Sequence, residues 1–413
     1  MVRKMSGSYK NKWWLKIGLS CLACLPITLH SEPVQPKKKI LVLCSNGGNG
    51  HNSAARALKE ILNDRFEFKV IYPINELQIF GVKSGEELYN MALRNRWTRS
   101  VNVVSKYVAP KIFRGYKKRL EAMITEEIAN NKPDLVISVI PFINLFASEA
   151  ARKVGVPYLM ITTDNDLQTQ VHGLQGISHP QFKVVIAPYH HPGREMLFQR
   201  NIPEKSIETL GFPLRSDFLK KKDAVLLKAE YHIDSHKPVV LIMFGGAGGG
   251  TAYDYAKKVG QAQLGAHLIV CAGRNQSLAE KLYKLKLHPT NSMTVMEFTD
   301  KIADLMALSD VIITKPGTLS ITESLTMRLP ILIDCTSPVI DWEKANIEIV
   351  RHYGVGSTIE KLDNVESLVR TYLYDMELRH EIQKSYDKVP SNRFNESIAS
   401  LIDQMCSKDL LRN

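Results

Sequence analysis

Cysteine is scarce in this chain, which has six cysteines among 413 residues. So few cysteines in a chain of this length do not make a disulfide framework. Cys21 and Cys24 form a CxxC pair, but it lies in a hydrophobic stretch without a second pair, so neither zinc binding nor redox chemistry is indicated. We expect Cys44, Cys271 and Cys335, each in or beside an apolar run, to be small core residues.

Two familiar nucleotide-binding motifs are also missing. The glycine-rich run at 245–250 lacks the Lys-Ser/Thr pair of a P-loop, so NTP hydrolysis is not indicated. It also does not fit GxGxxG with an acidic residue at the dinucleotide spacing, which argues against a dehydrogenase. With 44% hydrophobic and 23% charged residues, the composition is that of a folded globular protein.

Acidic residues are nearly absent from two stretches of a chain whose net charge is +12. Residues 1–39 hold eight Lys/Arg against one acid, and residues 94–119 hold nine Lys/Arg and no acid. Trp97, Tyr107, Phe113 and Tyr116 are interleaved with the second cluster. Aromatic rings among cations suit an anionic membrane surface, so we expect Arg94, Arg96, Trp97 and Arg99 to contact lipid. Nucleic acid would suit the same patch, although we do not expect it, and a solvated helical face is the plain alternative.

The first 38 residues read as a targeting segment and a linker. Trp13 to Leu29 is apolar apart from Lys16 and follows basic residues, as in a signal peptide or a signal anchor. At roughly 17 residues it is marginal for spanning a bilayer, which takes about 20. Cleavage and retention as an anchor both stay open.

The rest of the chain reads as two α/β domains. Strands are expected at 40–44, 68–72, 134–139, 158–162 and 184–187, and again at 238–244, 267–271, 294–296, 311–314 and 331–334. Strands that alternate with helices predict parallel sheets covered on both faces. We therefore predict two facing Rossmann-like domains, 39–212 and 238–380, joined by a polar connection at 213–237 and followed by C-terminal helices at 381–413. A ligand site between such domains is the default expectation.

A glycine-rich loop at 46–53 follows the first strand and opens a helix. Gly48 and Gly50 would let the backbone approach a ligand, and His51 would face the cleft from the helix start. A tight turn with a capping histidine is the plain alternative. Farther along, Asp164-Asn165-Asp166 spells DxD, a motif that binds a metal in some enzymes. In a two-domain protein we interpret this motif as part of a loop on the acceptor side, and metal binding remains an alternative.

The run from Ile313 to Leu325 carries the most information. A strand ends at Thr314, Pro316-Gly317 makes a turn, and a helix is expected to start near Thr318. Backbone N–H groups of that helix start, with the hydroxyls of Thr318 and Ser320, could hold a diphosphate. Glu323 lies about one turn in, where its two oxygens could accept both hydroxyls of a ribose. A helix-capping role for Glu323 is the alternative.

Together these stretches resemble a family. The runs at 45–53, 244–250 and 313–325 are similar to the monogalactosyldiacylglycerol synthases and the bacterial processive diacylglycerol glucosyltransferases, which are related to the lipid-linked peptidoglycan N-acetylglucosaminyltransferase. The runs at 133–138, 162–164, 211–215, 271–275 and 343–346 also agree, so the resemblance covers about residues 38 to 360. It implies a GT-B fold, a UDP-sugar donor, no metal or other cofactor, and inversion at the anomeric carbon.

The resemblance also implies roles for particular residues. Phe298 and Ile302 would lie against the uracil, Glu323 would hold the ribose, and Gly317, Thr318 and Ser320 would take the diphosphate. Glu343 and Asn346 would face the sugar or phosphate, and the donor side would also include Gly246, Arg274, Asn275 and Lys315. The usual Gly-Gln-Glu is replaced by Asp341-Trp342-Glu343, and Asn49 and Asn52 stand where the synthases often have Gly and Arg. These departures leave open which sugar is used and which acceptor.

These features predict a hexosyltransferase that acts on a membrane lipid such as diacylglycerol. His51 is the first choice for the base because histidine titrates near neutral pH, and Asp164 is the second. Because nucleotide sugars are cytosolic, we expect a membrane-associated protein on the cytoplasmic face, with the N-terminal segment retained. A UDP-sugar 2-epimerase of the same architecture and a non-catalytic module that binds nucleotide sugar or lipid remain the alternatives.

Overall fold

The structure of the protein is a computed structural model that describes residues 37–46, 50–79, 82–83, 91, 97–170, 174, 177–189, 193–246, 248–249 and 251–407. The chain divides into two units, Met1–Pro36 and Lys37–Asn413, and all described residues belong to the second. The predictions for the N-terminal targeting segment and for Gly48, Arg94 and Arg96 therefore lie outside the described residues.

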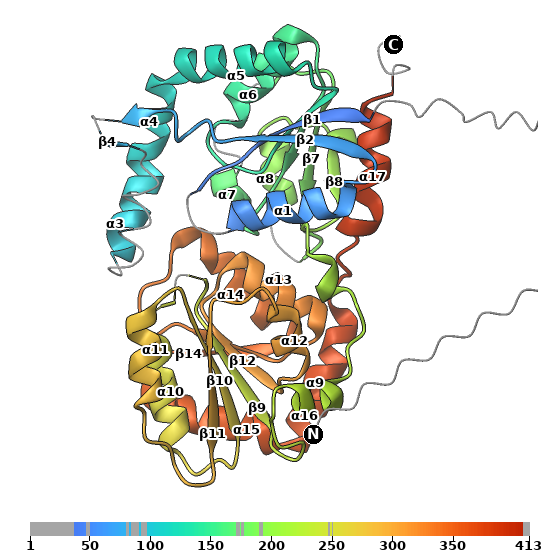
Figure 1. The fold of residues 1–413 in the computed structure, drawn as a ribbon. Helices are drawn as coiled ribbons and strands as arrows, with labels where there is room; N and C mark the ends of the chain where they lie inside the picture. Colours follow the sequence, from blue (N-terminus) through green and yellow to red (C-terminus); the bar gives the residue numbers. More distant parts are fainter. Residues whose placement is uncertain are drawn as a thin grey trace, which may run out of the picture. The chain divides into compact units, whose positions relative to one another are not determined.

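The first half of the second unit is built on a six-stranded parallel sheet with the strand order β2-β1-β5-β6-β7-β8 (Figure 1). Its strands are β1 (Lys38–Leu43), β2 (Phe66–Ile71), β5 (Leu135–Ser138), β6 (Tyr158–Ile161), β7 (Phe182–Ile186) and β8 (Ile207–Thr209). β3 (Gln78–Ile79) and β4 (Val82–Lys83) form a separate two-stranded antiparallel sheet. The five strands expected from the sequence are confirmed, and β8 was not anticipated.

Helices cover both faces of this sheet because its strands are apolar on both sides. Ile40 and Val42 face one cluster, in which α1 (Gly50–Leu62) and α17 (Phe394–Met405) pack. Leu41 and Leu43 face the other cluster, with α5 (Lys117–Asn131), α6 (Asn144–Val154) and α8 (Gly193–Gln199). The alternation along β1 is the period of two that a strand imposes on its side chains.

The second half repeats the plan with the strand order β11-β10-β9-β12-β13-β14, again all parallel. Its strands are β9 (Val239–Met243), β10 (His267–Gly273), β11 (Ser292–Glu297), β12 (Val311–Thr314), β13 (Ile331–Asp334) and β14 (Gly356–Ile359). Its helices are α9 (Ala224–Glu230), α10 (Thr251–Gln261), α11 (Gln276–Tyr283), α12 (Ile302–Ala307), α13 (Thr318–Met327), α14 (Lys344–Tyr353), α15 (Val365–Tyr374) and α16 (Met376–Ser385). The strand order reverses between β9 and β12, and open α/β sheets bind ligands at such a point.

The last helix, α17, belongs to the core of the first half although it follows the second half in sequence. Phe394, Ile398 and Ile402 pack on the first sheet, together with α1 (Figure 1). The segment predicted as C-terminal helices therefore splits, because Ile382 of α16 packs in the core of the second half.

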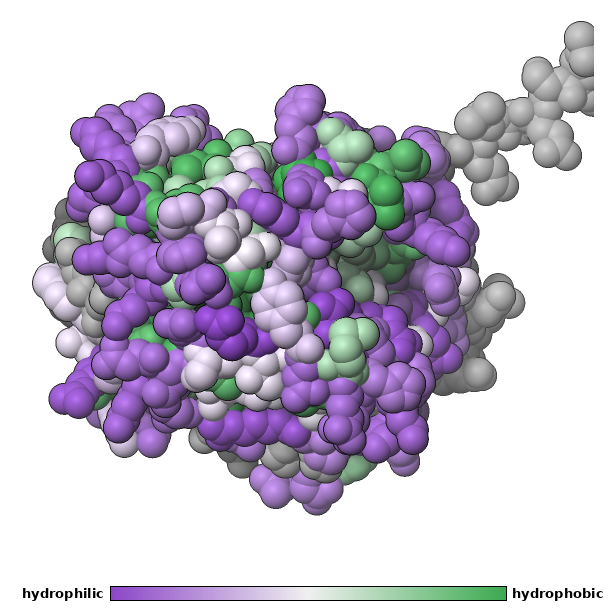
Figure 2. All heavy atoms as spheres, turned by 90° about the horizontal axis from the view of Figure 1, so that it is seen from below, coloured by the Kyte–Doolittle hydropathy of each residue, from purple (hydrophilic) through white to green (hydrophobic). Residues whose placement is uncertain are grey.

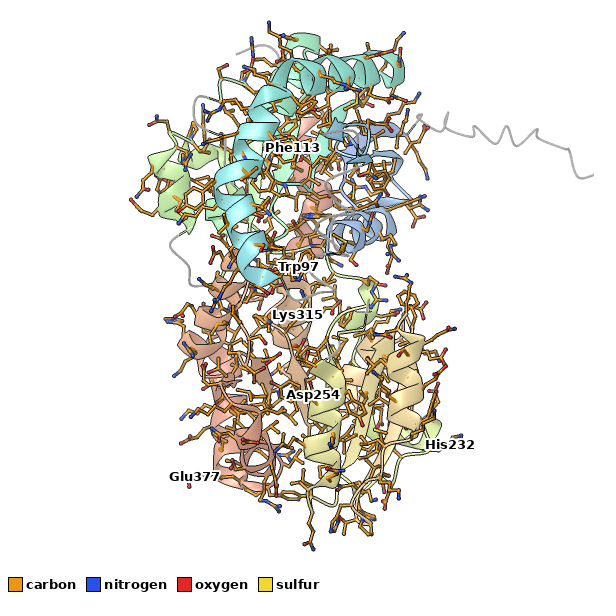
Figure 3. All side chains as sticks on the ribbon, turned by 90° about the vertical axis from the view of Figure 1, so that its left-hand side faces the viewer. Trp97, Phe113, His232, Asp254, Lys315 and Glu377 are labelled. Carbon is orange, nitrogen blue, oxygen red and sulfur yellow. The ribbon has the colours of Figure 1, made fainter. Side chains whose placement is uncertain are left out.

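A helical segment runs through most of the basic and aromatic cluster. It consists of α3 (Thr98–Val103), a π-helical turn η1 (Val104–Val108) and α4 (Ala109–Gly115). Figure 3 shows this segment extending from Phe113, which is buried, to Trp97, which is 52% exposed. It is the segment that we predicted to contact lipid.

The face shown in Figure 2 is mainly hydrophilic, and its apolar side chains form smaller patches. Within the described ranges, no helix is both long enough and apolar enough to cross a bilayer.

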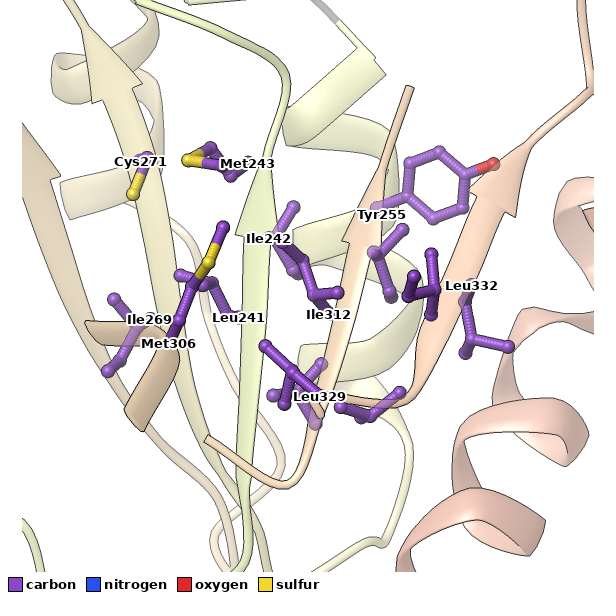
Figure 4. Packing of buried hydrophobic residues seen from close by; sticks show 14 of the residues in the cluster. Leu241, Ile242, Met243, Tyr255, Ile269, Cys271, Met306, Ile312, Leu329 and Leu332 are labelled. Atoms are coloured by element: carbon purple, nitrogen blue, oxygen red, sulfur yellow. The ribbon is translucent and has the colours of Figure 1, made fainter. Parts of the chain in front are cut away.

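The core of the second half is formed by side chains from both faces of its sheet. Figure 4 shows Leu241 and Ile242 of β9 packed between Ile269 of β10 and Ile312 of β12. Cys271 is also in this cluster, and Cys44 is in the core of the first half, as expected. Cys335 only packs against the core and is partly exposed.

Candidate functional site

His51 lies at the start of α1, just after the loop that follows β1. Its Nδ1 atom is 2.7 Å from the carbonyl oxygen of Val139, which follows β5, and 3.0 Å from the hydroxyl of Thr163, which follows β6. A carbonyl oxygen can only accept, so Nδ1 carries the proton and donates to it. In the neutral ring, Nε2 then holds the lone pair, which is the form required of a base.

Asp164 follows Thr163 and joins the two halves. Its carboxylate accepts from Gln170 at 2.7 Å, and from the hydroxyl of Thr318, at the start of α13, at 3.3 Å. Burial raises the pKa of Asp164 to about 6, and the negative charge of Glu343 adds to this, while the bonds from Gln170 and Thr318 act in the opposite direction. A carboxyl with this pKa can take or give a proton near neutral pH.

A second link between the halves is formed by two asparagines. Asn346 of α14 is fully buried; its Nδ2 donates to the carbonyl of Pro316 at 2.8 Å and to the hydroxyl of Thr318 at 3.0 Å. Its Oδ1 accepts from Asn165 of the first half at 2.6 Å. The amide of Asn346 therefore holds the turn before α13. Its predicted influence on the sugar or phosphate would be indirect, through the position of that turn.

Lys315 and Glu343 form an ion pair at this turn. The Lys315 ammonium lies 2.7 Å from Oε1 of Glu343, and Glu343 is 8% exposed. Burial alone would lower the pKa of Lys315, but the carboxylates of Glu343 and Asp164 outweigh it and raise that pKa, so the ammonium stays charged. Gly317 lies against this pair, where an added Cβ would come within 3.2 Å of the Lys315 side chain.

Glu323 is a buried carboxyl of α13 that is 5% exposed. Among the described residues no hydrogen bond to its carboxyl group is found, and burial raises its pKa to about 8, while the charge of Arg215 acts in the opposite direction. No oxygen of Glu323 is among the fully buried polar atoms that lack a partner, so the carboxyl still reaches solvent, and hydroxyl groups of a ligand could donate to it there. Its position, inside the helix rather than at its N-cap, argues against the capping alternative.

The glycine loop after β9 is fastened to the loop after β10. The carbonyl of Gly246 accepts from the backbone N–H of Arg274 at 3.1 Å, and the Asn275 side chain donates to the Gly248 carbonyl at 3.1 Å. Asn275 also caps α11 through Leu278 N–H, so both ends of its amide have partners inside the protein. Gly248 has φ +72°, and an added Cβ would lie 2.0 Å from the Ala272 carbonyl, so glycine is required there.

A flat, partly exposed surface lies beside this loop. The guanidinium of Arg274 is 3.8 Å from the ring centroid of Phe298, which is 47% exposed. A ring backed by a cation suits stacking with a planar base. Ile302, the first residue of α12, is partly buried and packs on the core.

The remaining predicted site residues are Ser320, Gly50, Trp97 and Arg99. Ser320 lies in the first turn of α13 and is half-buried, and Gly50 begins α1 with open space around its Cα. Trp97 and Arg99 are exposed on the helical segment 97–115. The structure thus brings His51, Asp164, Lys315, Thr318, Glu343 and Asn346 into one network and leaves Trp97 and Arg99 outside it.

Sequence reasoning missed three polar residues of this network. Thr163 contacts His51, Gln170 contacts both Thr163 and Asp164, and Asn165 reaches Asn346. The run Thr162 to Asp166 was noticed for its acids and, at 162–164, for its resemblance to the family, and no role was given to its other polar residues. Its hydroxyl and amide neighbours after a predicted strand were the signal that could have identified them.

Comparisons with known proteins agree with this arrangement. Residues 236–339 match the Glycosyltransferase family 28 C-terminal domain. The chain is similar to the chloroplastic monogalactosyldiacylglycerol synthase of Spinacia oleracea, with 27% identity over 82% of this chain and 66% of that protein. It is also similar to the processive diacylglycerol beta-glucosyltransferase of Bacillus pumilus, with 24% identity over 91% of this chain and 97% of that protein.

Solved structures show the same fold. MurG of Acinetobacter baumannii superposes with a TM-score of 0.58 at 16% identity and covers 89% of this chain and 100% of its own. UGT89C1 of Arabidopsis thaliana, complexed with UDP-L-rhamnose, superposes with a TM-score of 0.57 at 13% identity. The match covers 90% of this chain and 100% of that chain. The two parallel sheets and these neighbours confirm the predicted GT-B fold with its Rossmann-like halves.

Proposed function

Since this chain is a glycosyltransferase of the GT-B fold that carries the family 28 C-terminal domain, we propose that it transfers a hexose from a UDP-sugar to a membrane lipid. Diacylglycerol is the acceptor we favour, because both relatives reported above are named for it. The observation that carries the proposal is the carboxyl of Glu323, which is buried and has no hydrogen bond among the described residues. Glu323 lies about one turn into α13, the helix that follows the turn containing Lys315.

The donor would lie along the start of α13. The ribose hydroxyls would donate to Glu323, which supplies the partners that this buried carboxyl lacks. The uracil would stack on Phe298, supported by Arg274. The diphosphate would lie at the N-terminus of α13, near Gly317 and Ser320, where backbone N–H groups and the helix dipole favour negative charge.

Departure of UDP would be assisted by the charge of Lys315. The Glu343 partner holds the ammonium in place and keeps it protonated. A fixed cation and a helix N-terminus, both preorganised, can offset the charge that develops on the leaving diphosphate. On this basis we propose transfer without a metal, and activity in the presence of EDTA is the check.

His51 would remove the proton from the acceptor hydroxyl. Its Nδ1–H is held by Val139, which leaves Nε2 as the basic atom. A direct attack by the lipid oxygen on the anomeric carbon, with UDP leaving from the opposite side, gives inversion. Asp164, with a pKa of about 6, is the second candidate base and contacts the donor turn through Thr318.

The acceptor membrane would be met by the helical segment 97–115. Val103, Val104, Tyr107 and Val108 are 55%, 48%, 57% and 41% exposed and share one helical face. Basic side chains edge that face, namely Arg99, Lys106 and Lys111. An apolar stripe bordered by cations lies at the boundary between headgroups and acyl chains of an anionic membrane. We therefore propose association with the cytoplasmic surface of the membrane.

The proposal is tested by measuring UDP release from UDP-glucose, UDP-galactose and UDP-N-acetylglucosamine, with and without vesicles that contain diacylglycerol. Release that requires diacylglycerol, with the hexose recovered on the lipid, is the expected result. Sugar isomerisation without lipid would instead identify a UDP-sugar epimerase. Binding of UDP without turnover, unaffected by His51→Ala, would identify a non-catalytic binding protein.

A further inference from the structure

Asn102, on helix α3, fastens the segment 97–115 to the second half of the molecule. Its Nδ2 atom donates to the carbonyl of Val339 at 3.2 Å, and its Oδ1 atom accepts from the N–H of Asp341 at 3.0 Å. An amide that donates and accepts at once fixes both the position and the orientation of the backbone it meets. The neighbouring Val103 and Val104 are exposed.

The backbone held by Asn102 leads directly to the donor site. Glu343 N–H donates to the Ile340 carbonyl at 2.9 Å, which closes the short 3-10 turn η4 (Asp341–Glu343). Glu343 in turn pairs with Lys315 at 2.7 Å. A continuous series of contacts therefore runs from the exposed helix face through Asn102 to the ammonium beside the diphosphate turn.

We propose that Asn102 is a positioning residue that couples membrane docking to donor binding. When the apolar stripe enters a membrane, α3 is held still, and Asn102 holds the segment 339–343 in the arrangement that the donor needs. Less ordering is then left to occur when the donor binds, so its affinity rises. This inference rests on the proposed function, because it assumes the UDP-sugar site and the membrane face described above.

Coupling of this kind is reciprocal. If vesicles tighten UDP binding by some factor, UDP must tighten vesicle binding by the same factor. We expect a factor of about five to ten, at the lower end of the range typical of coupled sites. A purely structural role for Asn102 would lower the folded fraction or the melting temperature and would leave this ratio unchanged.

The experiment measures the dissociation constant of UDP with and without vesicles of diacylglycerol and anionic phospholipid. For the wild-type chain we expect tighter UDP binding on vesicles. For Asn102→Ala we expect equal UDP affinity with and without vesicles, and unchanged vesicle binding in the absence of UDP. The matched control is Asn131→Ala, whose amide bonds to Glu127 within α5 at 2.9 Å, and it should keep the wild-type ratio.

A second variant keeps the test decisive if the alanine variant folds poorly. Asn102→Asp retains the acceptor for Asp341 N–H and loses the donor to Val339, so we expect an intermediate ratio. The inference is overturned if Asn102→Ala keeps the full ratio, or if the wild type makes lipid-linked sugar but binds UDP equally well without vesicles. A wild type that binds UDP but transfers no sugar to lipid overturns the proposed function itself.

Discussion

The Nδ1 atom of His51 lies 2.7 Å from the carbonyl oxygen of Val139, which ties the start of α1 to the end of β5. Thr163, at 3.0 Å from the same nitrogen, adds a contact from the end of β6. Three neighbouring strands thus orient one imidazole, and the carbonyl selects the tautomer with a basic Nε2. This orientation is a second reason, beside the neutral titration range of histidine, for preferring His51 over Asp164 as the base.

Replacement of His51 by alanine should lower kcat strongly and leave donor binding intact. General-base catalysis contributes roughly 10²- to 10⁴-fold, so we expect a loss in this range with UDP affinity within twofold of wild type. Thr163→Val, which removes one orienting contact, should cost less than His51→Ala. A kcat for His51→Ala within threefold of wild type would rule out this role.

The affinity for UDP should depend on pH through Glu323. Burial raises the pKa of Glu323 to about 8 in the free protein, and hydrogen bonds from ribose hydroxyls stabilise the ionised form and lower that pKa. Binding therefore releases a proton, so affinity should rise from pH 6 to pH 8 and level off above. Calorimetric titration checks this, and Glu323→Gln should abolish the dependence and weaken binding about tenfold. An unchanged slope in Glu323→Gln would contradict the assignment.

Removal of Lys315 should destabilise the protein because of the partner it leaves behind. In Lys315→Met the buried carboxylate of Glu343 loses its counter-ion, which should lower the free energy of unfolding by about 1 to 3 kcal/mol. The double variant Lys315→Met/Glu343→Gln removes that charge and should recover part of the loss, while activity stays low. Denaturant unfolding of wild type, both single variants and the double variant measures this, and equal instability of the double and the Lys315 variant would contradict it.

If the helical segment 97–115 contacts the membrane, substitutions on it should weaken membrane binding without changing the sugar transfer itself. Val104→Ser/Tyr107→Ser removes apolar contacts, and Lys111→Glu reverses a charge worth about 1 kcal/mol at an anionic surface. Both variants should sediment less with anionic vesicles and keep wild-type activity on a dispersed, short-chain diacylglycerol. Val225→Ser, on exposed α9, serves as the control. Equal sedimentation of all variants would place the membrane face elsewhere.

The sequence was a good guide wherever the local pattern determines the structure. The apolar runs around Leu241 and Ile312 predicted two central strands, and the turn at Gly317 predicted the start of α13. The spacing of Phe394, Ile398 and Ile402 is that of an amphipathic helix, yet nothing in such spacing says which sheet the helix will cover. That partner depends on tertiary packing and was found only in the structure.

The contacts of polar residues at the site were equally hard to predict from the sequence. The identities of Asn275 and Asn346 fit ligand contacts and internal contacts equally well, and the structure gives the amides of both residues partners within the protein. Asn102 stood in a cluster singled out for its charges and rings, so its amide drew no attention. Hydrogen bonds between residues more than 200 positions apart, such as that between Asn102 and Asp341, have no signature in a single sequence.

The most direct test of the account is to identify the product formed from a UDP-hexose and diacylglycerol vesicles. We predict one equivalent of UDP for each hexose transferred and, by NMR, a β-linked glycosyl-diacylglycerol formed from the α-linked donor, with EDTA present. Free hexose, an α-linked product or UDP release that is independent of diacylglycerol would contradict inverting transfer to a lipid.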